Sequence, residues 1–541
     1  MLAWVEKTGR GARRFLRANA GAIAPMYALM VVPMTLSVGV AVDIGRSVTA
    51  RNNLQDALDA TGLAISHMGY SSSTSADTVQ AAADKWILAN VHDQSICGSP
   101  VPDPKDPTTN KCSNITVNVS PSTQDVTLVA NATVSTMMGG LAGIKQVPIS
   151  ATTVVQWGLS HIELALVLDN TGSMADDHKI QTLISSANSL VDTVAASASA
   201  SNDPNALKIS VVPFSDTVNV GSSYYNASTN TPASWLTGSL PSAYGSDIFT
   251  TAGTNRLPLF TSLGTSWGGC VESRMPPYDV QDTAPDPNVP GSMFVAFFSP
   301  DEPGAGNTTS YPNDYLADGL TSSKKVTYTW QQLQGNPAKY TAKPRSGTSS
   351  SGYSYGPNAG CSGLQPLLRL TTDTSSVHTK INAMNAIGDT NIVMGLMWGW
   401  HTLSPNAPFA DGVAYNTPNT TKVVVLLTDG MNTETDDGTN DSSFYSGLGF
   451  IWQGRLGLSS GASASQRQAA MDARQIQLCN NMKAQNIVIY TVQIDTPGTA
   501  PAALSGCASD PSKFYDVQDV SNLNSAFQSI AGSIGHLRIS Q

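Results

Sequence analysis

The feature that most constrains this chain is an uncharged stretch of 22 residues, Gly21 to Val42. As a helix that rises 1.5 Å per residue, it covers roughly 30 Å, which is the thickness of the hydrocarbon core of a bilayer. The alternative is a cleaved signal peptide, but its apolar region is normally only about 7–15 residues long and precedes a small-residue cleavage site. We therefore predict an uncleaved transmembrane helix over residues 21–42.

The charges around this stretch predict its orientation. The first 20 residues contain one acid, Glu6, and five basic residues: Lys7, Arg10, Arg13, Arg14 and Arg17. Basic residues accumulate on the cytoplasmic side of a span. We expect residues 1–20 to be a cytoplasmic tail and the bulk of the chain to lie outside the cytoplasm. The net charge of −10 and the lack of a basic stripe argue against nucleic acid as a partner.

Six cysteines suit an exported chain, in which an even number indicates disulfides. None forms a CxxC pair, which argues against zinc or thioredoxin-like chemistry. Six cysteines allow about 15 pairings. Sequence neighbourhood favours Cys97–Cys112, Cys270–Cys361 and Cys479–Cys507, and free buried thiols are the alternative.

Residues 43–157 carry the pattern of a small α+β region. The apolar span continues into an amphipathic helix, with Leu54, Leu58 and Ile65 near helical spacing. A second helix is predicted after Ser75 or Asp77, either of which is a suitable N-cap. Three later segments alternate apolar and polar residues, as half-buried antiparallel strands do: 114–119, 125–134 and 147–157.

From residue 158 onward the pattern changes to continuous apolar runs separated by helical stretches. The runs are 162–169, 206–216, 421–430 and 486–495, with a shorter one at 513–517. Such runs are typical of strands covered on both faces. We predict an α/β domain over 158–541 with a doubly wound, mostly parallel sheet. Its last helix is expected to have Ser521 as N-cap.

The alternation of strands and helices is interrupted between about 215 and 360. Gly, Pro, Ser, Asn and aromatic residues dominate there without a sustained period. We predict a large loop-rich insertion, held together by Cys270–Cys361. Disorder is not expected, because its many aromatic side chains need burial.

Three polar clusters follow predicted strands or precede a helix. "DNTGS" supplies Asp169, Thr171 and Ser173, "GDTNI" supplies Thr390, and "LLTDG" supplies Asp429. In open α/β sheets, sites form beyond the carboxyl ends of the strands. Two carboxylates and three hydroxyls make a hard-oxygen shell of the kind that Mg²⁺ or Mn²⁺ prefers. We therefore predict that the five residues are ligands of one divalent ion.

These clusters resemble the metal-ion-dependent adhesion site of the von Willebrand factor A domain, in which a D-x-S-x-S loop joins a distant Thr and a distant Asp. The resemblance implies that the site holds Mg²⁺, or Mn²⁺ or Ca²⁺. It also implies a protein ligand that supplies a carboxylate to the metal. Thr171 departs from the pattern, since the family usually has Ser there, and the added methyl group is expected to weaken metal affinity.

A nucleophilic role for Asp169 is the alternative. "DNTGS" resembles the D-K-T-G-T phosphorylation loop of P-type ATPases, but Asn170 replaces the Lys. The sequence has no P-loop, HExxH or G-x-S-x-G motif, and an external location removes the usual ATP supply. An extracytoplasmic phosphotransfer enzyme or hydrolase is thus a remote alternative, and we predict that the protein is not an enzyme.

One acidic segment lies just after Asp429. It does not fit the register of an EF-hand. A solvated acidic rim is the interpretation that we prefer, and a second cation site is the alternative. Its carboxylates are Glu434, Asp436, Asp437 and Asp441.

The N- and C-terminal sequences resemble TadG-like proteins of the tight-adherence (Flp) pilus system of bacteria. The resemblance implies a single-pass protein of a bacterial cell membrane whose bulk is periplasmic or extracellular. The N-terminal match runs through "VDIGRSVTARNNLQDALDATGLA", and the C-terminal match includes Cys479 and Cys507. Pilin-like relatives that are cleaved by a dedicated peptidase have Glu five positions after a Gly. In this sequence the residue five positions after Gly21 is Met26, so this cleavage is not expected and the helix is retained. The resemblance implies a non-enzymatic, metal-dependent binding protein for pilus assembly or surface adhesion, with a pilus subunit or assembly component as partner. A structural pilus-base component with a non-functional metal site is the alternative.

Overall fold

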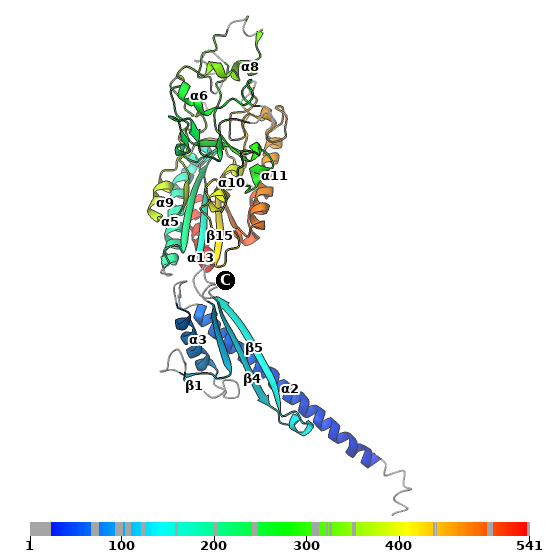
Figure 1. Cartoon of the computed structure of the whole chain (residues 1–541). Coiled ribbons are helices and arrows are strands. Elements are labelled where there is room, and N and C mark those ends of the chain that lie inside the picture. Colours follow the sequence, from blue (N-terminus) through cyan, green and yellow to red (C-terminus); the bar gives the residue numbers. More distant parts are fainter. Residues whose placement is uncertain are drawn as a thin grey trace, which may run out of the picture. The chain divides into compact units, whose positions relative to one another are not determined.

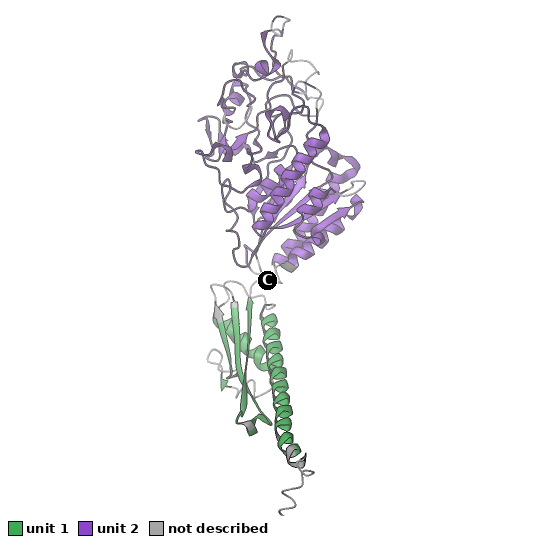
Figure 2. Cartoon of the chain, turned by 90° about the vertical axis from the view of Figure 1, so that its right-hand side faces the viewer, with its two compact units in different colours: residues 1–159 green, residues 160–541 purple. Residues whose placement is uncertain are grey.

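The structure is a computed structural model, and its chain forms two compact units, residues 1–159 and 160–541 (Figure 2). It describes residues 23–66, 75–91, 101–102, 110–120, 125–156, 161–199, 203–240, 247–303, 313–320, 323, 327–348, 353–436, 439, 441–494 and 501–537. The predicted cytoplasmic tail, residues 1–20, lies outside the described residues.

The first unit is built on the long helix α2 (Ile23–Ser66) (Figure 1). Within the described part of the chain, one helical segment, Leu29–Ile65, is long and apolar enough to cross a membrane by length and composition. The C-terminal half of α2 buries Leu54, Leu58 and Ile65, which confirms the predicted amphipathic extension.

Helix α3 (Ala76–Asn90) and an antiparallel sheet complete the core of this unit. Ser75 is the N-cap of α3, because its side chain accepts a hydrogen bond from Thr78 N. The sheet has the order β3 (Ile115–Ser120), β4 (Asp125–Ser135) and β5 (Gln146–Gln156), as the alternating pattern predicts. A separate pair of two-residue strands consists of β1 (Val101–Pro102) and β2 (Asn110–Lys111).

A six-stranded sheet forms the centre of the second unit. Its order is β14 (Leu368–Thr371), β7 (Leu207–Phe214), β6 (His161–Asp169), β15 (Thr420–Thr428), β16 (Val488–Ile494) and β17 (Phe514–Val517). All neighbouring strands are parallel except β14, which is antiparallel to β7. The predicted α/β fold with a mostly parallel sheet is confirmed.

Helices cover both faces of this sheet (Figure 1). Along β6, Leu164 and Leu166 pack in one apolar cluster, whereas Ala165 and Val167 pack in the other. Because successive strand residues point to opposite faces, burial of both faces requires the continuous apolar run seen in the sequence. One face packs on α5 (Lys179–Ser199), α9 (Thr374–Asn382) and α13 (Leu523–Leu537). The other packs on α10 (Ile392–Leu403), α11 (Ala464–Ala484) and α12 (Ala502–Cys507).

The predicted N-cap of the last helix is wrong. A short 3-10 turn, Val520–Asn522, precedes α13. The carboxylate of Asp519 accepts a hydrogen bond from Ser521 N across 2.9 Å. The helical segment therefore begins earlier than predicted: Asp519 is the capping residue, and Ser521 lies inside the first turn, where its own backbone N–H is the donor.

The insertion folds around short strands and an aromatic core. A second sheet has the order β11 (Leu236–Thr237), β13 (Phe294–Ala296), β12 (Cys270–Glu272) and β8 (Val218–Asn219). Smaller elements are β9 (Tyr225–Asn226), β10 (Thr231–Pro232), α6 (Leu257–Ser262) and α8 (Trp330–Gln334). The ring of Phe294 lies 4.9 Å from that of Trp398 on α10, so the insertion shares the core of the domain.

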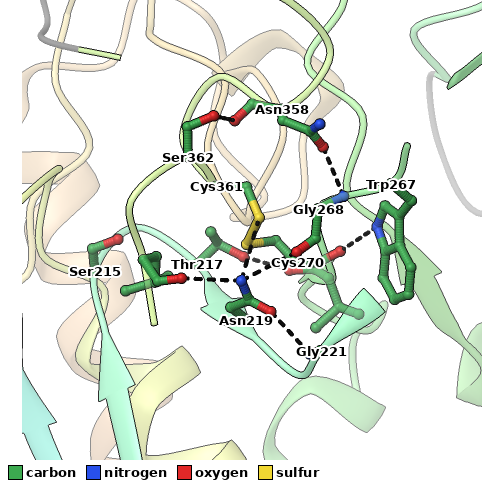
Figure 3. Close-up of a disulfide and its surroundings, with 12 residues drawn as sticks. Ser215, Thr217, Asn219, Gly221, Trp267, Gly268, Cys270, Asn358, Cys361 and Ser362 are labelled. Carbon is green, nitrogen blue, oxygen red and sulfur yellow. Dashed lines mark hydrogen bonds between the residues drawn. A yellow bond between two sulfur atoms is a disulfide. The ribbon is translucent and has the colours of Figure 1, made fainter. Parts of the chain in front are cut away.

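A disulfide joins Cys270 to Cys361 inside the insertion, as predicted (Figure 3). Asn219 lies beside it: its side-chain amide donates to the carbonyl of Leu364 across 3.0 Å and to that of Gly268 across 3.2 Å. This places the disulfide at the junction between β8 and the loops that return to the sheet.

The Cys479–Cys507 disulfide is also confirmed, and it ties α11 to α12. Cys112 is disulfide-bonded as well. Its predicted partner, Cys97, lies outside the described residues.

Candidate metal centre

The order of the sheet creates one position at which a ligand site is expected. From β6 the chain moves to β7 on one side, whereas the strands after β15 lie on the other side. Where the winding direction reverses in this way, the loops beyond the carboxyl ends diverge and leave a crevice. Asp169 is the last residue of β6, and Asp429 directly follows β15. The two predicted carboxylates therefore meet at the switch point.

Asp169 is fully buried, and its carboxylate is held by both neighbouring segments. Oδ1 accepts a hydrogen bond from Thr171 N at 2.8 Å, and Oδ2 accepts one from Thr428 Oγ1 at 2.6 Å. Burial, and next the negative charge of Asp429, raise the pKa of Asp169 to about 7. A nearby cation would relieve both effects, because it would compensate the lost hydration and the repulsion.

A chain of side-chain contacts connects the remaining loop residues to Asp429. Thr171 Oγ1 lies 3.2 Å from Ser173 Oγ, and Ser173 Oγ donates to Asp429 Oδ1 across 2.7 Å. The other oxygen, Oδ2, accepts a hydrogen bond from Lys179 Nζ at 3.0 Å. Ser173 is solvent-exposed, whereas Thr171 and Asp429 are buried. The site thus opens toward solvent on the side of Ser173.

The loop that carries Thr390 adjoins the Asp169 loop through two backbone hydrogen bonds. Gly172 N donates to Gly388 O across 2.8 Å, and Ile387 N donates to Asn170 O across 2.7 Å. Thr390 Oγ1 lies 3.7 Å from the position that a Cβ on Gly430 would occupy. The loop before α10 therefore lies against both the Asp169 loop and the residue after Asp429.

Gly388 makes this approach possible. Its φ is +83°, a backbone conformation that side chains disfavour, and an added Cβ would lie 2.0 Å from Tyr353 Oη. Glycine is required here by both the dihedral angle and the lack of space.

Sequence reasoning missed two residues of this centre. Thr428 holds the carboxylate of Asp169, and Lys179 forms an ion pair with Asp429. Thr428 had a visible signal, since it directly precedes Asp429 at a strand end. Nothing in the sequence marked Lys179, because its pairing depends on how the first turn of α5 lies against β15.

The predicted solvated acidic rim is wrong for Glu434 and Asp441, which are buried. Ser446 Oγ donates to Glu434 Oε2 at 3.0 Å, and Trp452 Nε1 donates to Asp441 Oδ1 at 2.8 Å. Loops from 443–453 therefore fold over the acidic segment. Asp436 is exposed as predicted, and Asp437 lies outside the described residues.

Glu434 belongs to a buried acidic group near the candidate centre. Burial raises its pKa to about 8, and the charges of Asp389 and Asp216 add to this effect. Burial and Asp389 likewise raise the pKa of Asp216 to about 8. Glu434 Oε1 is buried without a hydrogen-bond partner.

The donor set at the switch point fits a hard divalent cation. It combines two carboxylates with the hydroxyls of Thr171 and Ser173, the oxygen types that Mg²⁺ and Mn²⁺ take. Thr390 lies on the adjoining loop. Within the described residues, no three His, Cys, Asp or Glu side chains are grouped to hold a metal ion. A metal at this centre would therefore depend on the hydroxyls of Thr171, Ser173 and Thr390, and on retained waters.

The N-terminal segment has a recognisable family. Residues 21–64 match the model of the Flp pilus-assembly TadE/G-like family. This match confirms the TadG-like resemblance of the N-terminal apolar segment and of the helical segment that follows it. No curated protein matches the chain.

Solved structures with similarity to the chain include pilus proteins. The vWF domain of the type V pili tip protein Mfa5 from Porphyromonas gingivalis is 12% identical, with a TM-score of 0.32 over 70% of this chain and 97% of that one. The PilB minor pilin from Streptococcus sanguinis is 10% identical, with a TM-score of 0.32 over 79% of each chain. Proximal thread matrix protein 1 from the mussel byssus, with a zinc-occupied MIDAS motif, is 11% identical, with a TM-score of 0.27 over 70% of this chain and 46% of that one.

Proposed function

We propose that this protein is a membrane-anchored, divalent-metal-dependent binding protein of a pilus assembly or adhesion system. The observation that carries the proposal is the convergence of Asp169 and Asp429 at the switch point, with Thr171 and Ser173 between them. The match of residues 21–64 to the TadE/G-like family supports the association with pili.

In this proposal the metal ion, Mg²⁺ or alternatively Mn²⁺ or Ca²⁺, is held by Asp169, Thr171, Ser173, Thr390 and Asp429. Ser173 supplies the solvent-facing side, so a partner approaches there. The partner supplies a carboxylate to the metal, and a pilus subunit or assembly component is the class that the family association favours. Because the same metal ion is bound by residues of this chain and by the partner's carboxylate, binding of the partner depends on the metal.

The proposed layout along the chain follows from the same features. Residues 1–20 form the cytoplasmic tail, 21–42 the membrane span, 43–157 a TadG-like region and 158–541 the metal-binding domain with its insertion at about 215–360. The exported part is periplasmic or extracellular. Disulfides, two of which lie in the second unit, suit that compartment.

Metal titration of the full chain, reconstituted in lipid nanodiscs, tests the metal site. We expect saturable Mg²⁺ and Mn²⁺ binding by calorimetry that Asp169→Asn removes while the thermal unfolding transition is retained. Asp192→Asn is the matched control, because that carboxylate is 73% exposed on α5, outside the site. Binding that survives Asp169→Asn would refute the ligand assignment.

A second measurement separates metal-dependent binding from a purely structural role at the pilus base. The full chain is immobilised, and the amount of pilus components that it binds is measured with and without chelator. Loss of retention with the fold intact supports the proposal, whereas retention that ignores chelator favours the structural alternative. Phosphate release above background would instead favour the enzymatic alternative.

A further inference from the structure

The hairpin between β4 and β5 exposes apolar side chains at its tip. The tip contains a short 3-10 helix, Gly139–Ala142, and three large side chains around it are open to solvent. Met137 is 70% exposed, Leu141 75% and Ile144 54%. The tip is nevertheless well ordered by hydrogen bonds: Thr136 N donates to Lys145 O, Thr136 Oγ1 to Ile144 O, and Ile144 N to Gly139 O. A rigid turn therefore presents these groups outward.

Helix α2 fixes where this tip lies. The carboxylate of Asp43 accepts hydrogen bonds from three successive backbone N–H groups of the tip, those of Met137, Met138 and Gly139, at 2.7, 2.9 and 2.8 Å. One turn earlier, an added Cβ on Gly39 would lie 2.4 Å from Met138 Cβ. The tip thus packs on α2 at residues 39–43, and Figure 1 shows the β4–β5 hairpin running beside this helix.

These contacts coincide with the end of the predicted membrane span. Residues 23–42 of α2 cover roughly 30 Å along the helix axis, and Gly39 lies in the last turn of that stretch. The helix surface beside the tip is itself exposed and apolar, with Val38 66%, Val42 51% and Ile44 55% exposed. Exposed apolar side chains of the tip therefore stand at the same level as exposed apolar side chains at the end of the span.

Charged groups mark the water-facing limit of this surface. Lys145 follows Ile144 at the base of the tip and is exposed, and Arg46 extends from α2 one turn beyond Val42 with 47% of its side chain exposed. Basic side chains at the edge of a span reach toward lipid headgroups while their stems contact apolar surface. The order of apolar groups followed by basic groups matches the outer boundary of a bilayer.

We infer that the β4–β5 tip is a second membrane contact, with Met137, Leu141 and Ile144 inserted into the outer leaflet beside α2. This inference rests on the proposed anchoring of the chain through residues 21–42. The occupant is lipid rather than a partner protein, because the tip lies at the height at which the adjoining helix is itself expected to enter lipid. Two insertion points would fix the tilt of the first unit on the membrane, whereas a single helix would leave it free to swing.

Environment-sensitive labelling in the full chain tests the inference. Single cysteines replace Leu141, Val38 or Val154, each is labelled with a nitrobenzoxadiazole probe, and the protein is reconstituted as one copy per nanodisc. Nanodiscs carry spin-labelled lipid with the quencher either shallow or deep in the acyl chain. Val154 is the matched control: it is 61% exposed and apolar, but lies along β5 opposite Thr127, away from the tip. The described part of the chain has no free cysteine that would compete for the label.

We expect quenching at both Val38 and Leu141, stronger from the shallow quencher because both positions lie near the outer end of the span, and no quenching at Val154. Quenching at Val38 without quenching at Leu141 would overturn the inference while leaving the anchor intact. A blue-shifted probe at Leu141 that no lipid quencher reaches would mean that protein covers the tip, and would also overturn it. Absence of quenching at Val38 would instead refute the anchoring on which the inference rests.

Discussion

Lys179 donates a hydrogen bond from Nζ to Asp429 Oδ2 across 3.0 Å, so a buried ammonium group neutralises a carboxylate that we assign to the metal. The side chains of Lys179 and Asp429 are 9% and 0% exposed, and removal of one partner from such a pair costs about 3–5 kcal/mol. Lys179→Met is therefore expected to lower the melting temperature in EDTA. The same variant should bind Mg²⁺ about tenfold more tightly, because a positive charge next to the ion is removed.

Lys208→Met is the control for this prediction. Lys208 Nζ lies 3.8 Å from Glu163, a buried carboxylate in the same sheet but outside the centre. Its substitution should not change metal affinity in calorimetric titrations. Equal or weaker Mg²⁺ binding by Lys179→Met would show that the lysine does not oppose the ion.

Thr171 carries a methyl group beside its hydroxyl, and two substitutions separate the effects of these two groups on metal binding. Thr171→Val keeps the shape but removes the oxygen, so we expect metal affinity to fall by about tenfold or more. Thr171→Ser keeps the oxygen and removes the methyl group, and should bind as tightly as the natural chain or more tightly. Calorimetric titration of both variants with Mn²⁺ is the measurement, and equal affinity of the Val variant would exclude Thr171 as a ligand.

The main strands of the second unit could be predicted because burial on both faces leaves a continuous apolar run, as in β6. The edge strand β14 could not. It has four residues, Arg369 within it is exposed, and it runs antiparallel to β7. A short, half-exposed edge strand carries no run long enough to distinguish it from a loop.

The sequence predicted those residues of the candidate site that lie at the ends of strands. Asp169 and Asp429 follow from the rule that parallel strands place their carboxyl ends at one edge. Lys179 and the burial of Glu434 were not predictable, because they depend on packing between segments far apart in the chain. The insertion buries Asp441 partly through Gln334, from a region whose sequence has no period to interpret.

Gly388→Ala tests whether the loop contact positions Thr390. The new Cβ would lie 2.0 Å from Tyr353 Oη, and the φ of +83° adds strain, so we expect a loss of at least about 2 kcal/mol of stability. Mg²⁺ affinity should fall as well, because Gly388 O bonds Gly172 N next to the ligand loop. Adding Tyr353→Phe removes the clashing oxygen, and thermal melting should show partial recovery in the double variant. No recovery would mean that the dihedral angle alone causes the loss.

The two confirmed disulfides are expected to contribute unequally to stability. Cys270 and Cys361 are 91 residues apart, and Cys479 and Cys507 are 28 apart. In the chain-entropy account, the longer loop contributes about 4–5 kcal/mol and the shorter about 3–4 kcal/mol. Thermal melting of the paired Ser variants should therefore show a larger loss for Cys270→Ser with Cys361→Ser. The reverse order would indicate that the insertion keeps its structure without the cross-link.

Burial of Glu434 makes the free energy of unfolding depend on pH, and it determines the direction of that dependence. Its folded pKa, about 8, lies above the ordinary value of 4.5, so the folded state retains a proton that the unfolded state loses. Its contribution to stability is present below pH 4.5 and is lost as the pH rises toward 8. Glu434→Gln mimics the protonated form and keeps an acceptor for Ser446 Oγ. We therefore expect the variant to match the natural chain near pH 4.5.

Above that pH, the Gln variant should become progressively more stable than the natural chain, by on the order of a few kcal/mol near pH 8. Melting temperatures from pH 4 to 9 in EDTA provide the measurement, with chelator present so that no cation neutralises the acidic group. A difference between the two proteins that is constant with pH would indicate a packing effect of the amide. A Gln variant that loses stability as the pH rises would show that the carboxylate is needed in its charged form.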